Sequence, residues 1–263
     1  MRPVFAIFSA RFRGLLQYRA AALAGLATQF FWGLIRLMIF DAFYRSSTAP
    51  QPMDYAQVAV YIWLGQAFFA LLPQWMDGEI QESLRSGTVA YEMLRPVGLY
   101  ELWFARNLAS RTAPVILRAV PLLAIAIPFL GLGLPASWTA AGAFCVAMVA
   151  AALLSAAIAT LMTTTLLWTV SGEGIWQLLA LTMWLFSGTL IPLPFFPEWL
   201  QPLVNALPFR GLMDVPFRIW SGHIPPSAVL PNLASVACWT AVIIGMGRLL
   251  IARGTRKLVV QGG

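Results

Sequence analysis

The sequence predicts an all-α membrane protein with six transmembrane helices, on the evidence of its composition, its long apolar stretches and the placement of its basic residues. Of the 263 residues, 60% are hydrophobic and only 10% are charged, whereas a soluble domain carries about 25% charged residues. Ten acidic and seventeen basic side chains are too few to cover a soluble molecule of this length. Lipid is therefore the expected solvent for much of the surface.

Six stretches are long and apolar enough to cross a bilayer, because about 20 apolar residues span a hydrocarbon core of about 30 Å. They lie at about 20–44, 56–75, 112–134, 138–165, 174–192 and 227–250. Helices are the expected form, since a helix satisfies its backbone amides within its own segment. The chain is thus expected to form a single transmembrane domain over residues 1–263.

Basic residues concentrate on one side of the predicted membrane. With the amino terminus inside, the inner segments hold twelve of them and the outer segments hold three. The twelve are Arg2, Arg11, Arg13, Arg19, Arg85, Arg95, Arg106, Arg111, Arg248, Arg253, Arg256 and Lys257. Because an excess of Lys and Arg marks the cytoplasmic side, we expect both termini in the cytoplasm. These residues are spread over loops rather than one face, which favours contact with lipid headgroups and argues against a nucleic-acid partner.

The first 19 residues predict a helix that lies along the inner face of the membrane. Phe5, Phe8, Phe12 and Leu15 recur at helical spacing, with polar residues between them. Such an amphipathic helix with arginines on its polar side is typical of a membrane interface. The alternative is an ordinary amphipathic helix packed on protein.

The segment 76–111 predicts a structured inner loop. It holds half of the acidic residues of the chain, and Glu79–Arg85 has the pattern of a short helix that Ser86-Gly87 would end. Pro96 should break the following segment, because proline lacks an amide donor and disfavours helix just before it. A helix–turn–helix arrangement is expected here.

The segment 193–226 is too charged to span simply and too apolar for a plain aqueous loop. Prolines, among them Pro194, Pro202 and Pro216, divide it into short pieces. Its tryptophans and phenylalanines are the aromatics expected at a membrane interface. We expect a broken or re-entrant outer segment of short helices.

Sequence signatures of catalysis are absent. The chain has no GxxxxGK[ST] phosphate-binding motif, no HExxH and no nucleophile elbow. Its one histidine, His223, is expected in a solvated outer turn, and its two cysteines share no CxxC motif. We therefore expect no catalytic residue, no metal site and no cofactor bound by this chain.

Arg36, inside the first span, either faces a solute path or pairs with another helix or the outer headgroups.

Two passages resemble the type 2 family of ABC transporter permeases. Gly87-Thr88-Val89-Ala90-Tyr91-Glu92-Met93-Leu94-Arg95-Pro96 is similar to the "LLRP" passage of one branch, with Met93 in place of the first leucine. Ser187-Gly188, Pro192-Leu193, Phe196-Pro197, Leu207-Pro208-Phe209 and Ser221-Gly222 are similar, in this order, to the outer segment of that family. The order of the features over nearly the whole chain supports the resemblance.

The resemblance implies the membrane subunit of an exporter in a bacterial inner membrane, driven by ATP and Mg on a separate ATPase chain. It implies two ATPase copies, a second permease subunit, identical or related, and a coupling helix that docks on the ATPase. The residues assigned to docking are Glu79, Glu82, Leu84, Arg85, Gly87, Leu94, Arg95 and Pro96. Those assigned to an outer gate are Pro192, Pro197, Trp199, Pro208 and Phe209. An amphiphilic, drug-like or lipid-like solute is expected; a lipid-modifying enzyme and an ATP-independent channel or scaffold are the alternatives.

Overall fold

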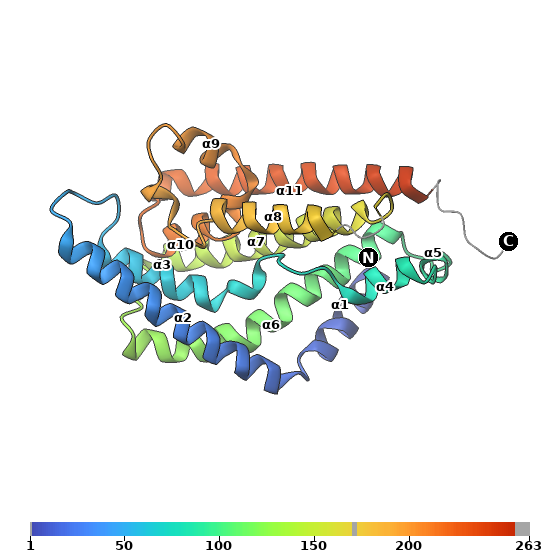
Figure 1. Ribbon diagram of the computed structural model, residues 1–263, viewed down its shortest axis with the longest axis horizontal. Coiled ribbons are helices and arrows are strands. Elements are labelled where there is room, and N and C mark those ends of the chain that lie inside the picture. Colours follow the sequence, from blue (N-terminus) through green and yellow to red (C-terminus); the bar gives the residue numbers. More distant parts are fainter. Residues whose placement is uncertain (1, 170–172, 256–263) are drawn as a thin grey trace.

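The structure is a computed structural model that describes residues 2–169 and 173–255, and these residues form helices joined by turns, with no strand among them. Four helices are long and apolar enough to cross a membrane. They are α2 (Arg19–Ser46), α6 (Leu99–Phe129), α7 (Trp138–Thr165) and α11 (Pro226–Gly254). Helix α7 packs against both α6 and α11, and the long helices extend along the long axis of the molecule (Figure 1). The predicted all-α membrane architecture is confirmed.

The other two predicted spans correspond to shorter helices. Helix α3 (Tyr55–Ala67) continues into the short 3-10 helix η1 (Phe69–Leu71), and α8 covers Glu173–Phe186. Every residue of α3 from Val58 to Ala67 is buried. A helix that is apolar on all sides belongs inside the protein, so α3 forms the centre of the bundle. The number of six spans stays a prediction.

Helix α6 begins earlier than the third predicted span. That span was expected at 112–134, but the helix starts at Leu99 and ends at Phe129. Its first turns contain the charged residues Glu101, Arg106 and Arg111. A search for apolar stretches excludes these turns, although no residue there ends the helix. At 31 residues it is about 46 Å long, longer than the hydrocarbon core. The last third of the predicted 76–111 loop is therefore the polar beginning of α6.

Helix α8 ends six residues before the predicted limit of the fifth span. That span was expected to reach 192, but the helix stops at Phe186 and a turn follows at Ser187-Gly188. Gly188 has φ +85°, a left-handed conformation that only glycine adopts readily. This turn is the reason why the helix stops early.

One end of the molecule, which we call the α4 end, brings together segments from both halves of the chain (Figure 1). It contains α1 (Arg2–Leu15), α4 (Gly78–Arg85), α5 (Val89–Met93), the start of α6 and the end of α11. A small core joins the last four of these, with Ile80, Val89, Trp103 and Ile251 among its buried members. Helix α1 packs against α6, while Phe5 on α1 is 70% exposed. The amino-terminal helix therefore packs on protein and also presents an apolar residue outward.

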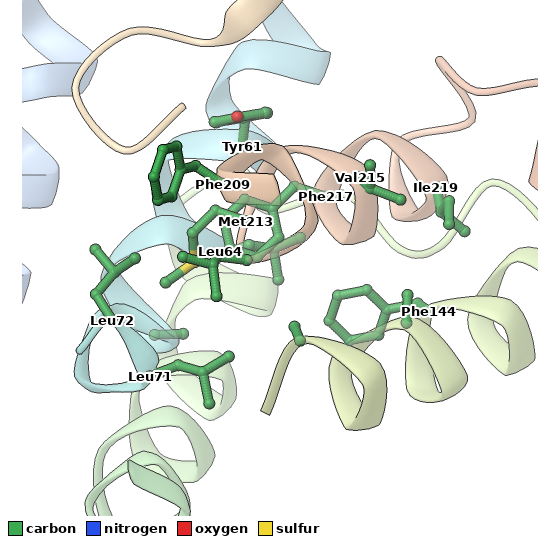
Figure 2. Close-up of a cluster of buried hydrophobic side chains, with 14 of the residues drawn as sticks. Tyr61, Leu64, Leu71, Leu72, Phe144, Phe209, Met213, Val215, Phe217 and Ile219 are labelled. Atoms are coloured by element: carbon green, nitrogen blue, oxygen red, sulfur yellow. The ribbon is translucent and has the colours of Figure 1, made fainter. Parts of the chain in front are cut away.

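The segment before α11 is broken as the prolines predict. It forms η2 (Leu193–Phe195), α9 (Gln201–Ala206), η3 (Pro208–Gly211) and α10 (Asp214–Trp220). Helix α10 enters the bundle and packs on α3 and α7. Its Phe217 is fully buried, with its ring centre 5.3 Å from that of Tyr61. Figure 2 shows the aromatic and aliphatic side chains of α10, α3 and α7 in this core.

Candidate functional site

The helix expected to dock on an ATPase lies within α4 at the end of the bundle. Asp77 precedes it, and its carboxylate accepts a hydrogen bond from the amide of Glu79 at 3.0 Å, the ordinary cap of a helix start. Ile80 is fully buried and anchors the helix to the small core. Gly87 follows with φ +75°, which allows the chain to turn toward α5. A cap, an anchor and a turn thus hold this short helix in place.

Most of the residues assigned to docking are exposed at this end. Glu82, Arg85, Gly87, Arg95 and Pro96 lie on the surface, and Leu84 is partly buried against the small core. A further exposed set is apolar and follows the turn: Tyr91 is 73% exposed, Met93 44% and Leu94 82%. These exposed charged and apolar residues lie on α4, on α5 and in the turns that follow them, and together we call them the docking surface.

Glu79 has a different environment from the other assigned residues. One of its oxygens accepts a hydrogen bond from Arg11 of α1 at 2.5 Å, and the other accepts from Arg106 of α6 at 2.9 Å. Arg11 also reaches the carboxylate of Asp77 at 3.3 Å. Glu79 thus links the start of α4 to two other helices rather than facing a partner alone.

Glu92 of α5 joins the same ionic network. Its carboxylate accepts hydrogen bonds from Arg106 at 2.7 Å and from the indole of Trp103 at 2.9 Å. The side chains of Arg106 and Glu92 are only 13% and 12% exposed, so this pair is well shielded from water. Arg106 therefore connects both short helices of the loop to α6. Beside it lies a cavity of about 780 Å³ between α1 and these elements.

The electrostatics of the network favour the charged form of Glu79. The hydrogen bond from Arg11 lowers the pKa of Glu79 below its usual 4.5, and the positive charges of Arg11 and Arg106 act in the same direction against a smaller opposing effect of burial. Glu79 is therefore ionised at neutral pH.

Arg111 lies one helical turn further along α6, and its buried guanidinium fixes the chain between η1 and α4. It donates hydrogen bonds to the backbone carbonyls of Leu72, at 3.4 Å, and Trp75. These carbonyls lie in the stretch that leads from η1 to α4. Arg111 thus ties the entry of the docking helix to the same long helix that Arg106 contacts.

The residues assigned to an outer gate differ in burial, and their role as a gate stays a prediction. Pro192 and Phe209 are buried, whereas Pro197 is exposed and Trp199 is 78% exposed. Pro208 is the first residue of η3 and is partly buried. The outer segment is thus folded, with Trp199 at its surface.

A buried polar contact joins the outer segment to the centre of the bundle. It involves residues that the sequence did not indicate as functional. The carboxylate of Asp214, fully buried at the start of α10, accepts hydrogen bonds from the hydroxyl of Tyr61 and from Arg218, each at 3.1 Å. The amide of Asp214 donates to the carbonyl of Ser187 at 3.2 Å. The turn after α8, the central helix α3 and α10 are therefore held together at one point.

Arg36 lies on the wall of a large groove between α2, α3 and α8. The groove has a volume of about 1010 Å³ and is lined mainly by apolar and aromatic side chains. The guanidinium of Arg36 donates a hydrogen bond to the carbonyl of Thr189 at 2.5 Å. Arg36 thus contacts both the groove and the turn that follows α8. Asp41 instead pairs with Arg45 one turn further on, at 2.9 Å.

Sequence reasoning placed Arg106 and Arg111 in the same inner loop as α4 but did not identify them, or Trp103, as hydrogen-bond partners of that loop. The available signal was the basic residues that follow the acidic stretch 77–92, since partly buried carboxylates require cationic partners. Placing Arg106 and Arg111 in a loop hid that they share one rigid helix. The Asp214–Tyr61 contact has no local signal, because 153 residues separate its members.

A comparison with protein-family models matches residues 30–262 to the model described as ABC-2 family transporter protein. The matched residues comprise nearly all of the chain after α1 and the start of α2. Among proteins with curated functions, none matches the chain.

Proposed function

Since the chain belongs to the ABC-2 family of transporter proteins, and is therefore a membrane permease subunit of an ABC transporter, we propose that it couples ATP hydrolysis by a separate ATPase chain to the export of an amphiphilic solute. The family implies partnership with an ABC ATPase. The observation that carries the finer proposal is the docking surface, held in place by the network of Arg11, Glu79, Glu92 and Arg106.

The docking surface has the composition of a protein interface. Large exposed apolar side chains such as Tyr91 and Leu94 supply area that a partner would cover. Glu82 and Arg85 beside them supply charges that would guide a partner into register. Both classes occur at the end of the bundle, away from the outer segment (Figure 1). An ATPase docked here would contact α4 and α5 directly.

The ionic network provides a route for motion. A displacement of α4 would act on α1 through Arg11 and on α6 through Arg106 and Arg111. Helix α6 runs from the α4 end along the bundle and packs on α3 and α7. Closure of two ATPase subunits on ATP would thereby favour one arrangement of the transmembrane helices over another. ATP and Mg belong to the ATPase chains in this mechanism.

In this proposal the α4 end faces the cytoplasm of a bacterium, and the chain lies in the inner membrane with both termini inside. The support is the distribution of basic residues, twelve in the segments assigned inside and three outside. One chain forms half of a transporter. A second permease subunit, identical or related, and two ATPase copies complete the assembly.

Reconstitution tests the function. The chain and its ATPase are placed in liposomes, and ATP-dependent movement of amphiphilic solutes is followed by fluorescence. The proposal predicts transport that requires both proteins and hydrolysable ATP. Absence of ATP-dependent transport for every amphiphile in a broad panel would contradict it.

A double variant tests the docking surface in the same liposomes. We expect Glu82→Ala with Arg85→Ala to reduce the stimulation of the ATPase and the transport rate together. Glu198→Ala is the matched control, because Glu198 is an exposed acid of the outer segment shortly before α9, and α9 lies away from α4 (Figure 1). Unchanged assembly and coupling in the double variant would place the docking surface elsewhere.

A further inference from the structure

The groove beside α2 is largely apolar but contains a small set of polar groups. Its aromatic walls include Trp32, Phe40, Trp184 and Phe195, from α2, α8 and η2. The polar side chains include Gln29, Arg36 and Gln66. A large apolar space with a few convergent polar groups is the usual form of a small-molecule site.

Gln29 is the first unusual member of this set. Its side chain is nearly inaccessible, with the residue 4% exposed, yet neither its amide nitrogen nor its amide oxygen has a hydrogen-bond partner among the described residues. A buried amide without partners is unfavourable unless something else satisfies it. Gln29 therefore lines the groove with an amide donor and an amide acceptor that no described residue satisfies.

Arg36 is the second unusual polar residue of the groove. It follows Gln29 by seven residues, so the two lie on the same face of α2, two turns and about 10 Å apart. Its one hydrogen bond in the described part of the chain goes to the Thr189 carbonyl, and no described carboxylate pairs with it. The acid nearest to it on α2, Asp41, is paired with Arg45 at 2.9 Å. A guanidinium in an apolar groove of a membrane helix thus lacks a counter-ion.

We propose that this groove binds an amphiphile with an anionic head group, such as a phosphate or carboxylate on an alkyl chain. Arg36 donates to the anion and Gln29 hydrogen-bonds the polar part of the same molecule, while the alkyl chain lies along the aromatic walls. An anion supplies both the missing charge and strong acceptors for the guanidinium. The inference rests on the proposed function, in which such a molecule is the transported solute, and it names the class of that solute.

Binding to the purified full-length chain tests this without the ATPase. The chain is placed in nanodiscs of zwitterionic lipid, and binding of radiolabelled hexadecyl phosphate is measured beside hexadecyl trimethylammonium and hexadecyl maltoside. We expect saturable binding of the phosphate and at least tenfold weaker binding of the other two. Inorganic phosphate should not compete, because the alkyl chain supplies part of the affinity.

Variants locate the site. Arg36→Gln should weaken binding of hexadecyl phosphate about tenfold or more, since hydrogen bonds to charged groups are the strong ones, and Gln29→Leu should weaken it severalfold. Arg45→Gln is the matched control, because Arg45 lies on the same helix, is exposed and pairs with Asp41. The affinity of this variant for hexadecyl phosphate should equal that of the wild type. Arg36→Gln could fail to fold, because it loses the contact with the turn at Thr189. In that case the head-group selectivity of the wild-type chain and the affinity of the Gln29→Leu variant still test the proposal.

Two results would overturn the inference. One is equal or tighter binding of the cationic or uncharged amphiphile. The other is a lack of hexadecyl phosphate binding together with efficient disulfide formation between two copies of the Trp32→Cys variant. This result would show that a second copy covers the groove. Either result leaves the transport test intact, because another solute can still be exported. Binding without ATP-driven transport would instead contradict the proposed function alone.

Discussion

At the scale of single residues, Gly188 shows how one missing side chain decides the packing of the outer turn. Its φ of +85° is unfavourable for other residues, and a Cβ there would meet the hydroxyl of Tyr61. That hydroxyl must remain in place to donate to the buried carboxylate of Asp214. Glycine at position 188 therefore leaves the room in which the turn, α3 and α10 meet.

We expect Gly188→Ala to destabilise the protein by about 2 kcal/mol or more, because the left-handed backbone alone costs about 1–2 kcal/mol and the overlap adds to it. Thermal unfolding in detergent measures this. Gly142→Ala in α7 is the control, since a Cβ there meets nothing within 4 Å and alanine is the better helix former. A variant at 188 as stable as the control would contradict this description of the turn.

Glu79 makes a prediction about pH. Its pKa is lowered in the folded protein, chiefly by the hydrogen bond from Arg11. The stabilisation it provides is therefore fully present above its ordinary value of 4.5 and is lost as the pH falls through the lowered value. The stability difference between the wild type and Glu79→Gln should be constant from pH 7 to about 5 and shrink below 4.5. A difference independent of pH down to 3 would show that the carboxylate has no cationic partner.

Two residues show which contacts the sequence predicts and which it does not. Sequence reasoning placed Arg36 as a possible member of a solute path, and the structure puts it on the wall of a groove. It assigned Glu79 to a docking surface, which stays a prediction, since the side chain is 61% exposed, but it did not predict the ion pairs with Arg11 and Arg106. These pairs were missed because Arg11 is 68 positions away from Glu79, and ion pairs between distant segments leave no pattern in the local sequence.

At the scale of elements, the prediction works best where local chemistry decides the outcome. Helix α4 begins and ends at a cap and a glycine that the sequence displays, and α7 covers the residues 138–165 expected of it. Helix α6 begins earlier than expected because hydropathy reports burial in lipid, not the length of the helix. Helix α8 ends earlier because the chain turns at Gly188, which has a left-handed backbone. The boundaries that hydropathy does not report were therefore the ones missed.

The tether between α1 and α4 can be tested with a matched pair of arginines. Arg11→Gln removes the contacts of α1 with Asp77 and Glu79, and we expect a loss of about 1–2 kcal/mol in stability. Arg13→Gln should change stability little, because Arg13 is exposed and its one hydrogen bond within the described residues goes to the carbonyl of Ser9 in the same helix. Thermal unfolding in detergent distinguishes them. Equal effects of the two changes would mean that α1 is held by its apolar contacts with α6 alone.

At the scale of the whole molecule, the two ends have different surfaces and different roles in the proposal. The α4 end carries the docking surface and the ionic network, and the far end carries the broken segment with α9 and α10 (Figure 1). The groove with Gln29 and Arg36 lies between α2, α3 and α8. The proposed mechanism requires that the ATPase contact only the first of these ends, which makes its position the central claim.

Site-specific photo-crosslinking measures that position most directly. A photoreactive amino acid replaces Leu94, 82% exposed at the α4 end, or Trp199, 78% exposed on the outer segment, and the complex with the ATPase is irradiated in the membrane. The account predicts a crosslink to the ATPase from position 94 and none from position 199. A crosslink from 199, with none from 94, would contradict it.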